Sequence, residues 1–402
     1  MTKNKKIMKN VDLVILVGGR GSRIKEFLKN KPKPMIKFNN IYFLQYLINN
    51  LSKYPFNKIY LLTGYKSEII FRNFHKKKFN LTEVICLKEK KPMGTGGALL
   101  NLKKKKINDF ILTNGDTIFD INLNELIGSY KKKTLGCVAL TNNKKNTNSF
   151  KLNSLDVKKN IISYKKNSPL MNGGIYFFKK KIINLLPNKP SSLEDNILPK
   201  VIQNKLLTGK FFKDFFIDIG TPKYLKNSEK KLLNQFKKPA VFLDRDGVIN
   251  HDYGYVYKRK DFKFKKGVLK GLHYLISKNY FIFIVTNQAG IAKGFFKESD
   301  FFKLQNSIKK ELSKKNIFID EIQYCPFHPH GQIKKYKKKS NLRKPGNQMI
   351  KNIFKKYLID KKKSFMIGDK ISDKKCAHKS NLYFSYAKDD FYKDLKKNMK
   401  KF

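Results

Sequence analysis

The hydrophobic residues of this chain fall into short apolar runs that alternate with longer amphipathic stretches. The runs are rich in Val, Ile, Leu and Phe, which predicts buried β-strands at residues 11–17, 58–63, 109–113 and 136–140. Between them, apolar positions with helical spacing predict helices at residues 41–51 and 123–130. Strands that alternate with helices indicate an α/β protein built on parallel sheets.

A second series of the same kind begins after residue 239. Strands are predicted at residues 240–243, 280–285 and 364–367, and a lysine-rich helical pattern at residues 223–236 closes the first series. The helical pattern stops at Lys237, Lys238 and Pro239, because proline cannot continue a helix. A length of 402 residues suits two domains, which we predict at residues 1–236 and 237–402.

The chain carries a formal net charge of +58, from 88 Lys and Arg against 30 Asp and Glu. Nearly all of the excess is lysine, which is scattered, whereas arginine stands at six positions. A protein that reads nucleic acid uses more arginine, because its planar group matches phosphates and guanine edges. We therefore expect solvated lysine faces and no nucleic-acid partner, in a field that attracts anionic sugar phosphates and nucleotides.

The cysteines and the apolar runs predict a compartment. Cys86, Cys137, Cys325 and Cys376 are far apart and form no Cys-x-x-Cys pair, which indicates a reducing environment without disulfides. No apolar run reaches the ~18 residues of a membrane helix, so we expect no membrane segment. We therefore expect a cytoplasmic protein, and the sequence leaves its oligomeric state open.

Glycine-rich and charged loops follow the strands of the first series. Residues 18–23 read GGRGSR directly after the first strand, and glycines there let backbone N–H groups approach a phosphate chain. Asp116, in NGD, ends a predicted strand, and Asp218 lies in DIGTP. Two aspartates are what Mg²⁺ prefers beside a triphosphate.

Residues 11–230 contain six motifs in a fixed order: GGxGxR, PKPM, GTxGA, NGD, NGGIY and DIGTP. With these motifs, the stretch resembles the sugar-phosphate nucleotidyltransferases. The resemblance implies a Rossmann-like sheet of the GT-A type, and attack of a sugar 1-phosphate on the α-phosphorus of a nucleoside triphosphate. Arg23 and Lys33 would neutralise phosphate charge, and Asp116 and Asp218 would hold Mg²⁺. The substrate-binding residues would be Gly18, Gly19, Gly21, Gly94, Asn172, Gly173, Lys166 and Glu194. Lys165 stands where the family often has a glutamate that reads sugar hydroxyls.

The second series opens on two aspartates at the end of a buried strand, in FLDRDGVIN at residues 242–250. Buried carboxylates are costly unless a cation or hydrogen bonds compensate them. Asp244 is suited to attack phosphorus, and Asp246 to protonate the leaving oxygen and then activate water. Three further motifs supply side chains that could bind a phosphoryl group and Mg²⁺. They are TNQ at residues 286–288, RKP at 343–345 and GDKISD at 368–373.

These motifs resemble the haloacid dehalogenase-like phosphatases, and FLDRDGVIN with TNQAGIAKG and RKP resembles their heptose bisphosphate and histidinol phosphatase branch. The resemblance implies a Rossmannoid sheet, with Asp244 as nucleophile and Asp246 as acid and base. Mg²⁺ would be held by Asp244, the Asp246 carbonyl and Asp369. The phosphoryl group and the rest of the substrate would be bound by Thr286, Asn287, Lys344, Lys370, Arg343, Asp252 and Tyr255.

One loop departs from that branch, many of whose members carry zinc ligands in the pattern Cys-x-His, then Cys-x-Cys before RKP. Here Phe327 stands at the histidine position, and Ser340 and Leu342 stand at the cysteine positions. Cys325, His328 and His330 remain, but three ligands do not close a tetrahedral site. We therefore expect a loop that folds without zinc.

The two predicted activities follow one another, since the phosphatase would leave the heptose 1-phosphate that a nucleotidyltransferase can use. We therefore predict two successive steps toward a nucleotide-activated heptose for surface polysaccharide, with GTP preferred by resemblance. Two alternatives are a histidinol-phosphate-type phosphatase beside a separate hexose 1-phosphate transferase, and a first domain that senses sugar nucleotides without turnover. A lysine-rich nucleic-acid binder would need basic residues clustered with stacking aromatics.

The paired aspartates generate the first testable prediction. Asp244→Asn should abolish phosphate release, because an amide cannot form the aspartyl phosphate, and it should leave nucleotidyl transfer unchanged. Both activities are measured on the same purified variant. Wild-type phosphatase turnover in Asp244→Asn would show that the nucleophile is another residue.

Overall fold

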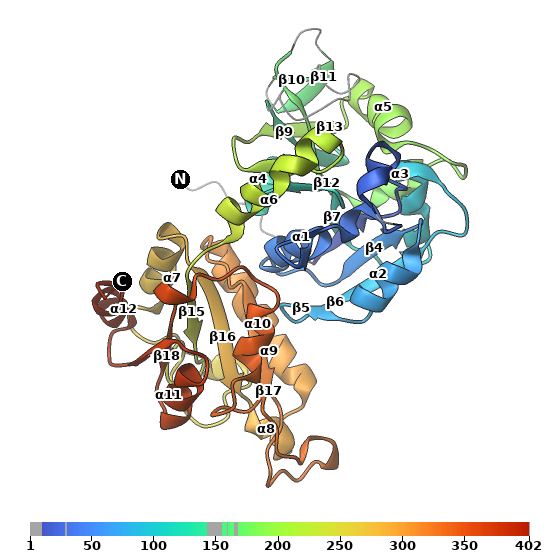
Figure 1. The fold of residues 1–402 in the computed structure, drawn as a ribbon. Helices are drawn as coiled ribbons and strands as arrows, with labels where there is room; N and C mark the ends of the chain where they lie inside the picture. The colour runs from blue at the N-terminus through green and yellow to red at the C-terminus, as the bar shows by residue number, and fades with distance from the viewer. Residues whose placement is uncertain (1–9, 29, 143–154, 159, 165–167, 402) are drawn as a thin grey trace. The chain divides into compact units, whose positions relative to one another are not determined.

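A computed structural model describes residues 10–28, 30–142, 155–158, 160–164 and 168–401. The chain divides into two compact units (Figure 1), each described here by itself. Unit 1 comprises Met1–Asn50 and Phe56–Leu232, and unit 2 comprises Leu51–Pro55 and Leu233–Phe402. No helix among the described residues combines the length and the apolar character needed to cross a bilayer.

Unit 1 is built on a ten-stranded sheet in the order β10-β11-β13-β9-β12-β7-β1-β4-β6-β5. Its strands are β1 (Val11–Leu16), β4 (Ile59–Thr63), β5 (Lys78–Phe79), β6 (Thr82–Lys88), β7 (Asp109–Asn114), β9 (Gly136–Thr141), β10 (Leu155–Lys158), β11 (Ile161–Tyr164), β12 (Met171–Phe178) and β13 (Leu207–Phe211). Two small sheets pair β2 (Lys37–Phe38) with β3 (Ile41–Tyr42), and β8 (Thr117–Phe119) with β14 (Phe216–Asp218).

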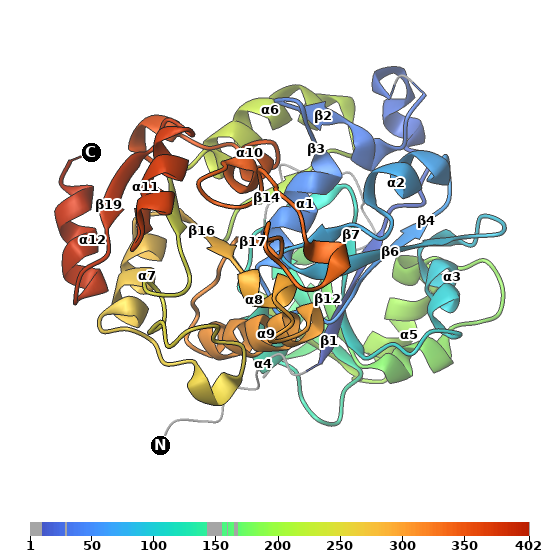
Figure 2. The same cartoon turned by 90° about the horizontal axis from the view of Figure 1, so that it is seen from below.

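The large sheet is mixed, which differs from the all-parallel sheet expected. Strands β7, β1, β4 and β6 run parallel and are neighbours in the sheet (labelled in Figure 2), whereas β12 is antiparallel to both of its neighbours. Both faces of β12 are buried, so its sequence is as apolar as that of a parallel strand. Its sequence therefore does not reveal that it runs in the opposite direction. The parallel strands place their carboxyl ends at one edge, where ligands of α/β sheets bind.

Helices α1 (Phe43–Ser52), α2 (Ser67–Phe74), α3 (Gly94–Gly97), α4 (Leu123–Gly128), α5 (Leu198–Gln203) and α6 (Pro222–Phe236) complete unit 1. The helix expected at residues 41–51 begins two residues later, because Ile41 and Tyr42 pair with β2. One core cluster joins the sheet to α5 through fully buried residues such as Leu112, Tyr176 and Val201. This packing fixes the strand ends that carry the predicted motifs.

Unit 2 holds a five-stranded, all-parallel sheet in the order β17-β16-β15-β18-β19. The strands are β15 (Ala240–Leu243), β16 (Phe281–Asn287), β17 (Glu321–Cys325), β18 (Phe365–Gly368) and β19 (Tyr383–Tyr386). The helices are α7 (Val268–Ser277), α8 (Ala289–Ala292), α9 (Glu298–Lys314), α10 (Gln348–Phe354), α11 (Ile371–His378) and α12 (Phe391–Met399).

Helices cover this parallel sheet, as its apolar strands require. Phe242 and Phe283 pack in one cluster with Met349 and Ile353 of α10. Helix α12 packs on α7 (Figure 2), where a Cβ on Gly271 would come within 2.4 Å of the Phe391 ring. The central strand β15 therefore ends in a protected position, and Asp244 is the residue that follows it.

Candidate functional sites

The loop after β1 borders a cavity of 670 Å³ in unit 1. Gly21 has a φ of +67°, a conformation that glycine adopts readily. It is the residue before a short helix at Ser22–Phe27. The structure brings together seven residues predicted from the sequence along this cavity: Gly18, Gly19, Gly21, Arg23, Lys33, Gly94 and Asp116. Loops that are far apart in the sequence thus form one binding space with cations and backbone N–H groups along its wall.

Lys33 is the buried cation of this cavity. Its ammonium lies 2.5 Å from Asp116 Oδ2, and its side chain is 9% exposed. Burial raises the pKa of Asp218 to about 6, Asp116 adds to the rise, and Lys33 and Arg23 oppose it. A carboxylate whose pKa is raised by burial and by a second carboxylate can share a divalent cation with it.

The residues predicted to read the sugar have local partners in the structure. Asn172 Nδ2 donates to the Tyr176 hydroxyl at 2.5 Å, and its Oδ1 accepts the N–H of Gly174 at 2.9 Å. A Cβ on Gly173 would come within 2.6 Å of the Phe119 ring, so this glycine allows close packing. Both are described residues and both stand outside the lining of the cavity. Lys165 and Lys166 lie outside the residues that the structure describes.

Glu194 is joined to the cavity through one intermediate residue. Its Oε2 accepts the hydroxyl of Thr95 at 2.7 Å, and Thr95 itself lines the cavity and accepts the N–H of Leu193 at 2.8 Å. Gly94, with a φ of +73°, has no room for a Cβ, which would come within 2.5 Å of the Ser191 carbonyl oxygen. Glu194 therefore fixes the glycine loop at residues 94–97 in addition to any contact with substrate.

Glu89 is a cavity residue that the sequence motifs did not indicate. It follows β6 directly and lines the cavity. Its Oε2 accepts the N–H of Met93 at 3.2 Å, while burial raises its pKa. The available signal was its place, since a carboxylate that directly follows a parallel strand stands at the ligand edge of the sheet.

In unit 2, Asp244 is held between the sheet and a buried lysine. Its backbone N–H donates to the Ile367 carbonyl at 3.0 Å, and its Oδ2 lies 2.9 Å from Lys344 Nζ. The residue is 6% exposed. Burial raises the pKa of Asp244 to about 7, and Lys344 opposes the rise. A carboxylate fixed at a strand end in this way is placed to attack an incoming phosphorus atom.

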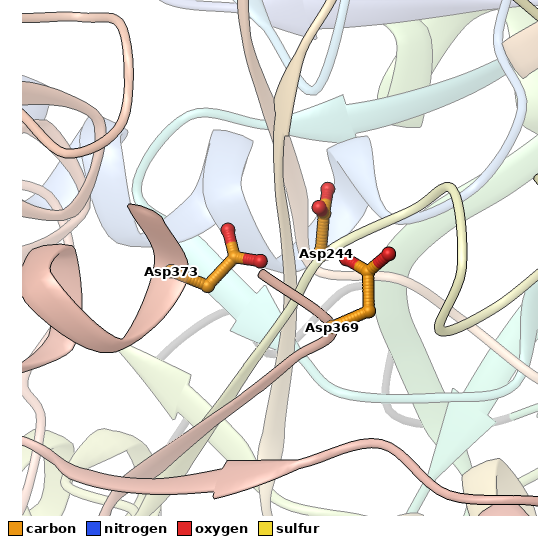
Figure 3. Close-up of side chains that lie close together, drawn as sticks. All are labelled: Asp244, Asp369 and Asp373. Carbon is orange, nitrogen blue, oxygen red and sulfur yellow. The ribbon is translucent and has the colours of Figure 1, made fainter. Parts of the chain in front are cut away.

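Three carboxylates gather around Asp244. The oxygens of Asp244, Asp369 and Asp373 lie within 4.8 Å of one another, and Figure 3 shows the side chains converging from two strand ends and helix α11. Burial raises the pKa of Asp369, and its Oδ1 is buried without a hydrogen-bond partner among the described residues. An orphaned buried carboxylate oxygen beside a second carboxylate fits a divalent cation.

Asp373 belongs to the GDKISD motif, but the sequence analysis gave it no role of its own. It is fully buried, its Oδ1 lies 2.6 Å from Lys344 Nζ, and its Oδ2 accepts the N–H of Lys370 at 3.0 Å. Lys344 thus bridges Asp244 and Asp373. Asp373 lies in the first turn of α11, four residues after Asp369. This spacing could have indicated that the two carboxylates lie close together.

The carboxylate of Asp246 is held by three side chains. Arg245 donates from Nε and Nη2 at 2.8 to 3.1 Å, Asn250 Nδ2 donates at 3.0 Å, and Gln288 Nε2 donates at 3.0 Å. Arg245 is 1% exposed and also donates to the Val256 carbonyl. None of these three partners was assigned from the sequence. Arg245 and Asn250 belong to the same loop as Asp246, whereas Gln288 comes from the loop after β16.

The remaining predicted residues of unit 2 surround this centre. Thr286 is buried and accepts from Gln288, and Asn287 exchanges two hydrogen bonds with the backbone of Lys344, at 3.0 and 3.1 Å. Arg343 has a buried Nη1 without a hydrogen-bond partner among the described residues, as a group that awaits an anion would.

Three more predicted residues stand at the exposed mouth of the site. Lys370 Nζ donates to Asp252 Oδ2 at 3.1 Å, and Tyr255 accepts from Lys293 at 2.8 Å. The Lys370 side chain is 58% exposed, and its ammonium lies 3.8 Å from Asp369 Oδ2 while it pairs with Asp252. Lys370 thus joins Asp252 to the edge of the aspartate cluster.

Two family models match the chain, one in each half. A nucleotidyl transferase model matches residues 13–235, and a polynucleotide kinase 3 phosphatase model matches residues 241–400. Among solved structures, HddC from Yersinia pseudotuberculosis is similar, with 30% identity and a TM-score of 0.47 over 55% of this chain and 99% of that chain.

Curated relatives match about a third of the chain. A D-glycero-alpha-D-manno-heptose-1,7-bisphosphate 7-phosphatase of Campylobacter jejuni is 46% identical over 137 residues, which are 34% of this chain and 74% of that protein. The corresponding beta-heptose enzyme of Photorhabdus laumondii is 43% identical over 139 residues, 35% of this chain and 74% of that protein.

The raised pKa of Asp244 generates a second prediction. Asp244 carries a proton for most of the time below its pKa of about 7, so a cation must displace that proton to bind. The apparent affinity for a divalent cation should therefore fall about tenfold for each pH unit below that value and level off above it. Phosphate release from a simple aryl phosphate, titrated with Mg²⁺ across this range, measures the effect. An affinity that stays constant below the pKa of Asp244 would contradict the expectation.

Proposed function

Because the chain belongs to the nucleotidyl transferase family and to the family of D-glycero-D-manno-heptose-1,7-bisphosphate 7-phosphatases, we propose that it catalyses two successive steps of nucleotide-heptose synthesis. A phosphatase domain at residues 237–402 removes the 7-phosphate of heptose 1,7-bisphosphate. A transferase domain at residues 1–236 then adds a nucleotidyl group to the heptose 1-phosphate. The observation that carries the proposal is that each unit has its own cluster of charged residues, the cationic cavity of unit 1 and the aspartate cluster of unit 2.

In the phosphatase step, Asp244 attacks phosphorus and the sugar oxygen leaves. Lys344 holds Asp244 in place and balances charge on the phosphoryl group, with the hydroxyl of Thr286 beside it. Asp246 protonates the leaving oxygen and then takes a proton from the water that hydrolyses the aspartyl phosphate. Asp244, the Asp246 carbonyl and Asp369 would hold Mg²⁺, which supplies positive charge opposite the phosphate oxygens.

In the transfer step, an oxygen of the sugar 1-phosphate attacks the α-phosphorus and pyrophosphate leaves. The backbone N–H groups of residues 18–21 bind the triphosphate, and Arg23 and Lys33 neutralise its charge. Asp116 and Asp218 would hold Mg²⁺, which draws charge away from the α-phosphate and the leaving group. Lys33, paired with Asp116, is positioned to exchange that carboxylate for a phosphate oxygen.

The carboxylate of Glu89 supports GTP as the nucleotide. Guanine presents two adjacent donors, N1–H and the amino group, whereas a carboxylate is an acceptor of two hydrogen bonds side by side. Glu89 stands in the cavity wall with one oxygen on the Met93 N–H, and an ionised carboxylate oxygen accepts more than one bond. Adenine and the pyrimidines offer no such pair of donors.

Analysis of products by mass tests the joint pathway. Heptose 1,7-bisphosphate, GTP and Mg²⁺ should give nucleotide-heptose with the whole protein. Asp116→Asn should stop at heptose 1-phosphate, and Asp244→Asn should give nucleotide-heptose when heptose 1-phosphate is supplied. Transfer to a hexose 1-phosphate but to no heptose 1-phosphate would break the joint pathway and leave two separate activities.

A substitution at Glu89 tests the choice of base. Glu89→Gln replaces one acceptor by a donor, so kcat/KM for GTP should fall about tenfold or more while the value for UTP changes less. Glu83→Gln is the matched control, because Glu83 lies on β6, the strand that Glu89 follows, and pairs with Lys58 at 3.0 Å outside the cavity lining. Equal losses with both nucleotides would show that Glu89 acts on the fold and not on the base.

A further inference from the structure

The segment between β17 and α10 carries Arg343 and Lys344 near its end and a short helix, Lys334–Tyr336, in its middle. It leaves the sheet at Cys325 and returns at Lys344, whose backbone is fixed by two hydrogen bonds to Asn287. This segment, residues 326–343, is named here the catalytic loop. The positions at which its relatives would carry metal ligands are Phe327, Ser340 and Leu342.

Two of these three positions are part of the hydrophobic core. Phe327 and Leu342 pack against the buried cluster that contains Cys325, Phe242 and Met349. Cys325 is fully buried, and its Sγ donates to the Phe327 carbonyl at 3.7 Å. The base of the catalytic loop is thus closed by apolar contact, which gains stability in proportion to the area removed from water.

The residues that remain do not fit a zinc ion. His328 Nδ1 accepts the N–H of His330 at 3.1 Å, so one of its two ligand atoms is already used. Within the described residues, Cys325, His328 and His330 do not come together as a group that could hold a metal. Ser340 Oγ accepts the N–H of Leu342 at 3.2 Å and closes a turn.

A glutamate fastens the far part of the catalytic loop. Glu298, the first residue of α9, accepts the Tyr324 hydroxyl through Oε1 at 2.5 Å and the Tyr336 hydroxyl through Oε2 at 3.2 Å. Tyr324 belongs to β17, whereas Tyr336 lies at the tip of the loop and its carbonyl accepts the N–H of His328 at 3.2 Å. Lys338 stacks over the Phe327 ring, with its Nζ 4.2 Å from the ring centre. One carboxylate therefore ties the loop tip to the rigid sheet.

We infer that these contacts replace a metal ion in the catalytic loop, and that Glu298 acts through Tyr336 as a positioning residue for Arg343 and Lys344. Hydrogen bonds to an ionised carboxylate are stronger than neutral ones. The two bonds to Glu298 therefore add to the backbone bonds that Gln332 and Ile333 donate to the Ala292 carbonyl at 2.8 and 2.9 Å. The kinetic part of the inference rests on the proposed phosphatase function, and its structural part does not.

The test compares Glu298→Gln and Tyr336→Phe with Glu311→Gln. Glu311 is the matched control, because it is on the same helix and pairs with Arg259 at the surface. Both loop variants should be cleaved by trypsin at Lys334 to Lys339 about tenfold faster than wild type, and the double variant should be no faster than the worse single one. Their KM for the bisphosphate should rise severalfold with a smaller change in kcat.

Wild-type protein should contain no stoichiometric zinc by elemental analysis, and a zinc-selective chelator in excess Mg²⁺ should leave its melting temperature unchanged. Stoichiometric zinc, a chelator-induced fall in melting temperature, or unchanged cleavage in both loop variants would each overturn the inference. If the chain released no phosphate from heptose bisphosphate while the loop variants still showed faster cleavage, the proposed function would fail and the fastening would stand.

Discussion

Both sites depend on a lysine ammonium buried among aspartates. In unit 2, Lys344 lies 2.9 Å from Asp244 and 2.6 Å from Asp373, and all three side chains are nearly or fully buried. Two carboxylates so close together would repel one another and lose hydration, and the ammonium compensates both costs. Lys33 has the same relation to Asp116 in unit 1. A lysine ammonium thus compensates the aspartates of each site before substrate binds. Once phosphate oxygens and a metal ion are bound, the metal ion compensates the aspartates and the ammonium can interact with the phosphate.

The chain is rich in lysine, yet these two lysines differ from the exposed majority. Lys309 is buried as well, but its ammonium donates to a backbone carbonyl, that of Ser52. Most lysines of the chain carry a hydrated charge on the surface, where screening makes an ion pair worth little. Lys33 and Lys344 are buried, and each follows or precedes a proline in a loop that holds the lysine backbone in place. The overall charge of +58 therefore says little about the chemistry, whereas the placement of two ammonium groups determines it.

The ordered motifs allowed the family, the fold class and the centre of each site to be predicted, and the family matches confirm the family and the fold class. The prediction worked because motifs at the ends of parallel strands meet at one edge, whatever the loops between them do. The prediction failed where the structure depends on contacts between residues that are far apart in the sequence. The antiparallel direction of β12, the bond from Glu298 to Tyr336 and the bond from Gln288 to Asp246 leave no periodic signal. The assignment of Gly173 to the substrate stays a prediction, and the structure adds that the Phe119 ring lies where a side chain at this position would be.

Gly247 shows how little freedom remains near the aspartate cluster. Its φ of +84° suits glycine, and a Cβ at this position would lie 2.3 Å from Asp369 Oδ2. Even a methyl group would displace the carboxylate that stands ready for a cation. Exposed positions of the chain have room for larger side chains, whereas this position has none. The distance between the loop backbone and the Asp369 carboxylate is set by the absence of a single carbon atom.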